Sequence, residues 1–278
     1  MKPFLLIALL LADTGATASP AGSSTVPLHL YQGKQFTIDA VVAGKRRTFL
    51  FDTGEGVTMI SPALAAETGC QPWGNVAAFR MLGERLDLKH CDNIRFIIGA
   101  GSYLAPTTIV YDLADVVGAG TKLDGAIGLD LFAGKLITLR FGAGEVVVEA
   151  GAEARTPQQR GIEVPIRLSR PAEGAALDAD IGVRTPKGIA WMELDSGNAG
   201  PTIFVSPAIA PLFGLRTDTK QSQDVTASMA PCVTFHGKAR VFPGMIMDGN
   251  IGLQFMRDWD ITFDLPNGRA WLRKTNGT

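Results

Sequence analysis

Two short acidic motifs, far apart in the chain, have residue types that could do chemistry. The first motif is Asp52-Thr53-Gly54 and the second motif is Asp195-Ser196-Gly197. Each follows an apolar run and joins an acid, a small hydroxyl residue and a glycine. One such motif is typical of an ordinary turn. Two of them interest us because two carboxyl groups brought together at about 3 Å cannot both ionise, so the pair holds one proton.

A pair of carboxyl groups that shares a proton can accept a proton from water and donate one to a carbonyl oxygen. This chemistry suits amide hydrolysis and requires no metal and no covalent intermediate. Thr53 and Ser196 offer hydroxyl groups that could hold the two loops together. Gly54 and Gly197 let backbone N–H groups come close to the carboxylates. We therefore predict Asp52 and Asp195 as catalytic residues, supported by these four neighbours.

The pairing of the motifs rests on an internal repeat. Five segments of the first half recur in the same order in the second: Val26-Pro27-Leu28 as Val164-Pro165-Ile166, the first motif as the second motif, Ser61-Pro62-Ala63 as Ser206-Pro207-Ala208, Asp124–Leu129 as Asp248–Leu253, and Ile137-Thr138-Leu139 as Ile261-Thr262-Phe263. The sequence predicts a first lobe over 19–150, a connection over 151–160 and a second lobe over 161–278. The first half also carries extra residues downstream of its acid, enough for a hairpin.

The elements that position the motifs are predicted to be mainly β-strands with short helices. The 32 Gly and 16 Pro favour many short strands and turns over a helical bundle. Hairpin turns are expected at 43–45, 99–101, 142–144, 236–237 and 266–268. Ser61-Pro62 and Ser206-Pro207 each predict a short helix, because Ser caps a helix and Pro opens it.

The first residues have the pattern of a secretory signal peptide over 1–18. Lys2 supplies the positive charge, 4–11 are apolar, and 16–18 form an A-x-A cleavage site. The apolar run is shorter than the roughly 20 residues of a membrane span, so an uncleaved anchor is the weaker alternative. A third motif copy, at 13–15, lies in this segment and is assigned no function. We expect an exported protein, periplasmic or secreted, with no membrane span after signal removal.

Charge and metal-binding residue types exclude several function classes. The net charge of −1 gives no reason to expect a nucleic-acid partner. The three cysteines and three histidines show no metal-ligand spacing, so neither a metal nor a cofactor is expected. Cys70 and Cys91 either pair in an oxidising compartment, leaving Cys232 free, or all three are small buried residues. Both interpretations stay open.

With these motifs in place, the chain resembles a pepsin-like, two-lobed aspartic peptidase of compact bacterial type, and its halves resemble retropepsin subunits. The resemblance rests on the two motifs and on the segments Ala126-Ile127-Gly128 and Asn250-Ile251-Gly252, where Asn250 departs from the family's apolar pattern. It extends to the closing stretch around 259–264. The resemblance implies an all-β fold of two pseudo-two-fold related, β-barrel-like lobes, the acid protease fold, with a cleft between them.

The resemblance also implies a flap, a hairpin that closes over bound peptide, in the extra residues of the first half. The candidate is 79–86, with Met81 and Leu82 as substrate-binding residues and Gly83 near the tip. The alternative is an ordinary surface hairpin. Glu55 and Asn198 follow the motif glycines, where the family has Ser, Ala or Thr.

The leading hypothesis is an exported, monomeric aspartic endopeptidase acting on polypeptide between apolar residues. A rival hypothesis is a binding protein that kept the cleft, lost catalysis and recognises a polypeptide or glycan. A third is narrow processing of a single partner protein.

Overall fold

The computed structural model of the protein describes residues 22–118, 120–150 and 155–275. The predicted signal peptide lies outside the described residues, as does part of the predicted connection. The described chain is mainly β, as the sequence predicts. None of its helices is long and apolar enough to cross a membrane.

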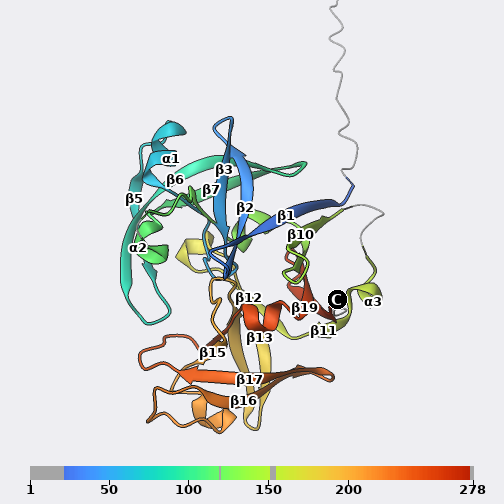
Figure 1. The fold of residues 1–278 in the computed structure, drawn as a ribbon. Helices are drawn as coiled ribbons and strands as arrows, with labels where there is room; N and C mark the ends of the chain where they lie inside the picture. Colours follow the sequence, from blue (N-terminus) through green and yellow to red (C-terminus); the bar gives the residue numbers. More distant parts are fainter. Residues whose placement is uncertain (1–21, 119, 151–154, 276–278) are drawn as a thin grey trace, which may run out of the picture.

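Both halves consist of runs of strands with short helices between some of them (Figure 1). The elements up to residue 150 are β1 Ser24–Tyr31, β2 Gln35–Val42, β3 Lys45–Phe51, β4 Met59–Ile60, α1 Pro62–Glu67, β5 Trp73–Phe79, β6 Arg85–Ile98, β7 Gly101–Val110, α2 Ala114–Val117, β8 Gly125–Ile127, the 3₁₀ helix η1 Leu129–Phe132, β9 Leu136–Arg140 and β10 Glu145–Glu149. Those after it are α3 Pro157–Arg160, β11 Ile162–Val164, β12 Ile166–Ser169, η3 Ala172–Gly174, β13 Asp178–Thr185, β14 Gly188–Leu194, β15 Thr202–Val205, η4 Ala210–Phe213, β16 Gln223–Ala230, β17 Val233–Val241, β18 Gly249–Ile251, α4 Leu253–Met256, β19 Trp259–Asp264 and β20 Arg269–Lys274.

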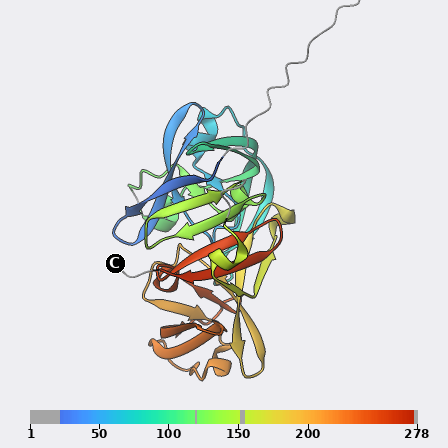
Figure 2. The ribbon, with the colours of Figure 1, turned by 90° about the vertical axis from the view of Figure 1, so that its right-hand side faces the viewer.

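The two halves meet at the pairing of β9 with β19. Thr138 of β9 stands opposite Thr262 of β19, its own repeat equivalent, and their hydroxyl oxygens are 2.8 Å apart. The strand order around this pair is β11-β20-β19-β9-β10-β1, so three strands of each half continue one sheet. Figure 2 shows these strands between the first half above and β12–β18 of the second half below. An antiparallel pair of repeat equivalents is what a local two-fold axis produces.

Both acidic motifs leave the end of a strand that pairs in parallel with a short buried strand. Phe51 of β3 stands opposite Ile127 of β8, and Leu194 of β14 stands opposite Ile251 of β18. The amides of the two acids continue these ladders, because Asp52 N–H donates to Ile127 O and Asp195 N–H to Ile251 O, each at 3.0 Å. The repeat therefore places the two motifs in the same local structure.

Most of the predicted turns and helices are present, with one exception in the second half. The β2–β3 hairpin turns at Ala43 and Gly44, both with positive φ, and Ser61 caps α1 by accepting the Leu64 N–H. The expected turn at 236–237 is wrong, because these residues lie inside β17 and the chain turns before it. The helix expected after Ser206-Pro207 is present as a short helical turn: Ala210 N–H donates to Ser206 O at 3.0 Å and η4 begins at Ala210, although the Ser206 hydroxyl makes no N-cap bond within the described residues.

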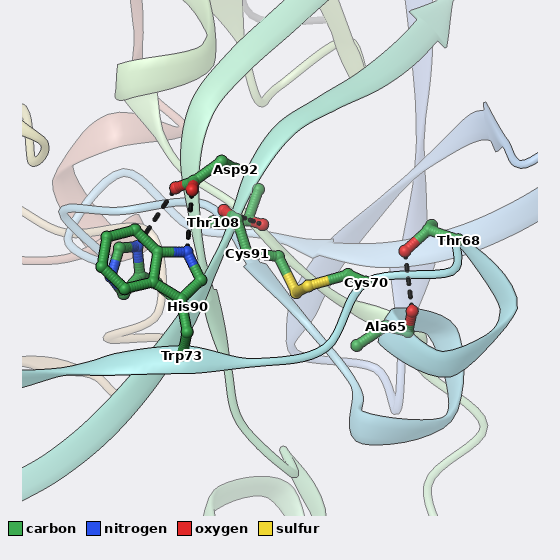
Figure 3. The surroundings of a disulfide bond; sticks show 8 residues. All are labelled: Ala65, Thr68, Cys70, Trp73, His90, Cys91, Asp92 and Thr108. Carbon is green, nitrogen blue, oxygen red and sulfur yellow. Dashed lines mark hydrogen bonds and ion pairs between the residues drawn. A yellow bond between two sulfur atoms is a disulfide. The ribbon is translucent and has the colours of Figure 1, made fainter.

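Of the two interpretations of the cysteines, the structure shows the disulfide between Cys70 and Cys91, whose Cα atoms are 6.0 Å apart. The bond ties the loop after α1 to β6 (Figure 3). Beside it, the Trp73 indole N–H donates to Asp92 at 2.8 Å, and the indole ring lies 4.3 Å from the His90 ring. Cys232 is free and exposed.

Candidate active site

The two motif loops are locked together by their hydroxyl residues. Thr53 N–H donates to Ser196 Oγ and Ser196 N–H donates to Thr53 Oγ1, each at 3.0 Å. Each hydroxyl then donates across to the other half, Thr53 to Leu194 O at 2.6 Å and Ser196 to Phe51 O at 3.0 Å. Both side chains are buried. These four reciprocal hydrogen bonds hold the two loops in a fixed position relative to each other.

The locked loops bring the two carboxyl groups together. Gly197 N–H donates to Asp52 Oδ1 at 3.0 Å and to Asp195 Oδ1 at 2.7 Å, so one backbone amide serves both acids. Gly54 N–H adds a second donor to Asp52 Oδ1 at 3.0 Å. The two carboxyl groups lie close enough for Asp195 to act directly on the pKa of Asp52.

Glycine is required at both motif positions because the opposite carboxyl group occupies the space of a side chain. A Cβ on Gly54 would lie 2.7 Å from Asp195 Cγ, and one on Gly197 would clash with the Asp52 carboxyl group. The backbone is rigid at this point, since each glycine neighbours a cross-bonded hydroxyl residue. A side chain here would therefore push the two acids apart.

The pair is set up to retain a proton. Burial raises the pKa of Asp52 well above its usual range, and the nearby Asp195 raises it further; the backbone donors act in the opposite direction. Such a pair gains and loses protons as a unit.

Further partly buried carboxyl groups lie in the neighbourhood of the pair. Burial first, and Asp52 and Asp195 next, raise the pKa of Glu55 well above its ordinary value. Burial and the neighbouring acids raise the pKa of Asp178 to about 7, and burial raises that of Asp130 to about 6. Asp130 accepts from Thr58 N–H at 2.9 Å and Thr58 Oγ1–H at 2.7 Å, which holds the loop after the first motif. The sequence placed Glu55 beside the pair, as a third acid that could perturb its titration or point to solvent, but it gave no indication of Asp130 or Asp178.

An amide network on the side of Asp195 was also missed. Asn250 Nδ2 donates to Asp195 Oδ2 and to Glu193 Oε2, the latter at 3.2 Å. Its Oδ1 accepts from Asn198 Nδ2 at 2.8 Å. Burial and the acids of the site raise the pKa of Glu193 well above its usual range. The sequence held one signal, since Asn250 and Asn198 both depart from the family pattern.

The residues predicted as the flap form a hairpin turn between β5 and β6. Arg80 N–H donates to Glu84 O at 2.9 Å and Gly83, at φ +82°, donates to Arg80 O at 2.8 Å. The tip touches the second half, because Ile246 N–H donates to Met81 O at 3.0 Å. Leu82 is 44% exposed beside it.

A cavity of about 630 Å³ lies between the β5–β7 sheet and the turn that contains η3. The wall residues from the first half include Trp73, His90 and Ile109. Those from the second half are Ala172, Glu173 and Ala175. The same turn continues to Leu177, whose N–H donates to Gly56 O at 2.9 Å, next to the first motif. The segment that follows the cavity wall in the second half is thus bonded to the loop after the first motif.

Comparison with solved structures identifies the architecture. The crystal structures of EDGP and of the basic 7S globulin from soybean each match with a TM-score of 0.58 at 9% identity, over 92% of this chain and 96% of theirs. Conglutin gamma from lupine seeds, a basic 7S globulin, matches with a TM-score of 0.56 at 10% identity, over 93% and 96%. The fold is the two-lobed acid protease fold. At these identities the likeness shows the fold alone. No protein-family model and no curated protein sequence matches the chain.

The structure thus brings together the six residues of the two motifs and places Met81, Leu82 and Gly83 at a hairpin tip that reaches across to the second half. No group of three or more potential metal ligands forms a metal site within the described ranges.

Proposed function

We propose that this protein is an exported aspartic endopeptidase that hydrolyses peptide bonds with a water activated between Asp52 and Asp195. One observation supports this most: a single amide, Gly197 N–H, donates to both carboxyl groups. A pair that is held this closely and shares one proton has an acceptor for a water proton and a donor for the substrate carbonyl.

In the proposed reaction the water oxygen bonds to the carbonyl carbon of the peptide. The ionised carboxyl group takes a proton from the water while the protonated one gives its proton to the carbonyl oxygen. The tetrahedral diol then breaks its C–N bond, and the leaving nitrogen receives a proton from the pair. One hydroxyl of the diol returns its proton to the pair as the carbonyl group reforms, so the products are a carboxylic acid and an amine and the pair again holds a single proton.

The flap residues and the cavity supply places for substrate. We propose that Met81 and Leu82 contact apolar side chains of a bound polypeptide, since the tip they form spans from the first half to the second. The cavity between β5 and the η3 turn offers room for one large side chain, with Trp73 and His90 on its wall. We retain the monomer as the proposed state, because one chain carries both acids.

The second candidate is a binding protein that recognises a polypeptide or glycan in the cleft without cleaving it. The names of the matched structures favour it, since two of the three reported are globulins and none is named as a peptidase. The two candidates differ in what the pair of acids does for a ligand. A catalytic pair binds a transition-state analogue far more tightly than it binds substrate.

Calorimetric titration with a peptide that carries a hydroxyl group in place of the scissile carbonyl separates the candidates. For a peptidase we expect tight 1:1 binding near pH 5, weakened at least about 100-fold by Asp52→Asn. Asp258→Asn, an exposed acid that pairs with Lys274, is the matched control and should leave affinity unchanged. Equal affinity in the wild type and Asp52→Asn would instead support the binding protein.

A further inference from the structure

The two halves differ at one pair of residues that stand opposite each other on neighbouring strands, next to the acid of each half. In the first half, Leu50 of β3 stands opposite Ala126 of β8. In the second half the same register joins Glu193 of β14 to Asn250 of β18. An apolar pair in one half is thus a polar pair in the other. Because Ala126 has no side-chain donor, only Asp195 has an amide side chain beside it at this position.

The direction of the Asn250 amide is fixed by Asn198. Gly200 N–H donates to Asn198 Oδ1 at 3.2 Å, which leaves Asn198 Nδ2 as the donor to Thr202 O at 3.3 Å and to Asn250 Oδ1 at 2.8 Å. A backbone N–H can only donate and a backbone carbonyl can only accept, so this assignment does not depend on which amide atom is called oxygen. Asn250 must therefore turn its NH₂ group away from Asn198.

The NH₂ group of Asn250 faces two carboxyl groups. One N–H donates to Asp195 Oδ2 and the other to Glu193 Oε2, and the side chain is fully buried. Two N–H bonds and two acceptors leave the group satisfied. A hydrogen-bond donor aimed at a carboxyl oxygen stabilises the ionised form of that acid.

Counting donors shows an imbalance within the pair. Asp195 accepts Gly197 N–H and Asn198 N–H on Oδ1 and the Asn250 amide on Oδ2, so both of its oxygens have donors. Asp52 accepts its two backbone N–H groups on Oδ1. We propose that Asn250 is a positioning residue that places the negative charge of the singly protonated pair on Asp195 and keeps the proton on Asp52.

The other titratable groups that face the pair do not reverse this assignment. Three act on the pair directly: Glu55 of the first-motif loop, Asp178 of β13 and Glu193 of β14. Asp130 of η1 and Asp180 of β13 act on Asp178, and one base, Arg167, acts on Asp180. The pKa of each carboxyl group is raised, with burial as the largest cause. At mildly acidic pH Asp130 and Asp178, with pKa values of about 6 and 7, are therefore mostly uncharged, and the pKa values of Glu55 and Glu193 are raised well above their usual range. We expect the hydrogen bonds to decide where the charge of the pair lies.

The assignment gives each acid its task in the proposed hydrolysis. Asp195 would take the proton from the attacking water, and Asp52 would donate to the carbonyl oxygen of the substrate. This catalytic role rests on the proposed function, whereas the position of the proton in the free protein does not.

The test is carboxyl ¹³C NMR of the full chain labelled at its Asp carboxyl carbons, near pH 5. We expect the resonance that disappears in Asp52→Asn to have the shift of a carboxylic acid, and the one that disappears in Asp195→Asn that of a carboxylate. Asn250→Leu should reduce this difference, and Thr262→Val, a buried polar residue in the central sheet, should leave it unchanged. The opposite assignment in the wild type would overturn the proposal even if the Asn250 variant did not fold.

Activity provides the second measurement. Without the Asn250 donor, the acidic limb of the kcat/KM profile should move up by about one pH unit, since a hydrogen bond to a charged group has an effect of this size. The Thr262→Val protein should keep the wild-type limb. An unmoved limb and an unchanged NMR difference in Asn250→Leu would refute the proposal and leave the peptidase function standing. A wild type that cleaves nothing would refute the proposed function, and the NMR would still decide the position of the proton.

Discussion

At the residue scale, the acids are positioned by backbone and amide groups. One N–H of Gly197 reaches both carboxyl groups, and the hydroxyl groups of Thr53 and Ser196 hold the two loops at that spacing. Because the glycine occupies the space between the acids, its lack of a side chain is as necessary as the acids themselves.

Gly197→Ala is predicted to disable the site. Its new methyl group would clash with the Asp52 carboxyl group, and a misplacement of about 1 Å can lower a rate about 100-fold. Peptide cleavage should fall by at least that factor, with a smaller effect on the melting temperature. Gly134→Ala is the matched control, because a methyl group there meets no atom within 4 Å. Activity equal to the control would show that the acids do not need this spacing.

The pair of acids could be predicted from sequence because the repeat links Asp52 to Asp195. The repeat also aligns Asn250 with Ala126, but the hydrogen bond from Asn250 to Asp195 could not be predicted from it. That contact depends on the parallel register of β14 with β18, which places Glu193 opposite Asn250. Periodicity in the sequence indicates which residues form strands and leaves the register between distant strands undetermined.

At the element scale, the β5–β6 hairpin is the asymmetric part of the fold. Its presence and turn follow from the surplus of residues in the first half and from Gly83. Its contact with the second half, Ile246 N–H to Met81 O, joins residues far apart in the sequence that no pattern connects. The hairpin turn predicted at 236–237 is absent, because the glycine at 237 lies inside β17 and the strand continues past it.

Leu82→Asp is predicted to weaken substrate binding. A charged side chain at the hairpin tip would have to lose water against an apolar substrate residue, so KM should rise about tenfold or more while kcat changes less. Leu104→Asp on β7 is the matched control, because Leu104 is 46% exposed and Leu82 is 44% exposed. Steady-state kinetics on an apolar peptide would measure the difference. Equal KM values in the two variants would remove Leu82 from the substrate site.

At the scale of the whole molecule, the two-fold repeat determines the architecture. The segment around Thr138 pairs with its own repeat equivalent around Thr262, so the central sheet could be expected once the repeat was recognised. The disulfide was one of two open interpretations, because the pairing of Cys70 with Cys91 depends on the approach of β6 to the loop after α1. The lobe boundaries at 150 and 161 stay predictions.

The buried acids predict how stability depends on pH. The pKa of Asp178 is about 7 and that of Asp130 about 6 in the folded protein, against 3.8 for an ordinary Asp. The folded state therefore binds more protons, so this stabilisation is complete below pH 4 and is lost as pH rises to about 7. Carboxyl groups with a lowered pKa, such as Glu149, act in the opposite direction only at lower pH. The melting temperature should fall by roughly 5–10 °C between pH 4.5 and 7.5.

Scanning calorimetry of Asp178→Asn tests whether the acids with raised pKa values cause this dependence of the melting temperature on pH. The neutral amide cannot ionise, so the variant should lose less stability than the wild type over the same pH range. Asp258→Asn, an exposed acid, should retain the full dependence. A wild-type melting temperature that rises from pH 4.5 to 7.5 would contradict the predicted protonation of the buried acids.

If Asp52 and Asp195 act together on water, the protein hydrolyses peptide bonds at a rate that depends on both acids. A mixture of apolar peptides incubated with the protein beginning at Ser19, near pH 5, should yield new carboxyl and amino termini by mass spectrometry. Asp52→Asn and Asp195→Asn should each lower that rate at least about 1,000-fold, because either change removes the shared proton. Cleavage by either variant at the wild-type rate would contradict the account.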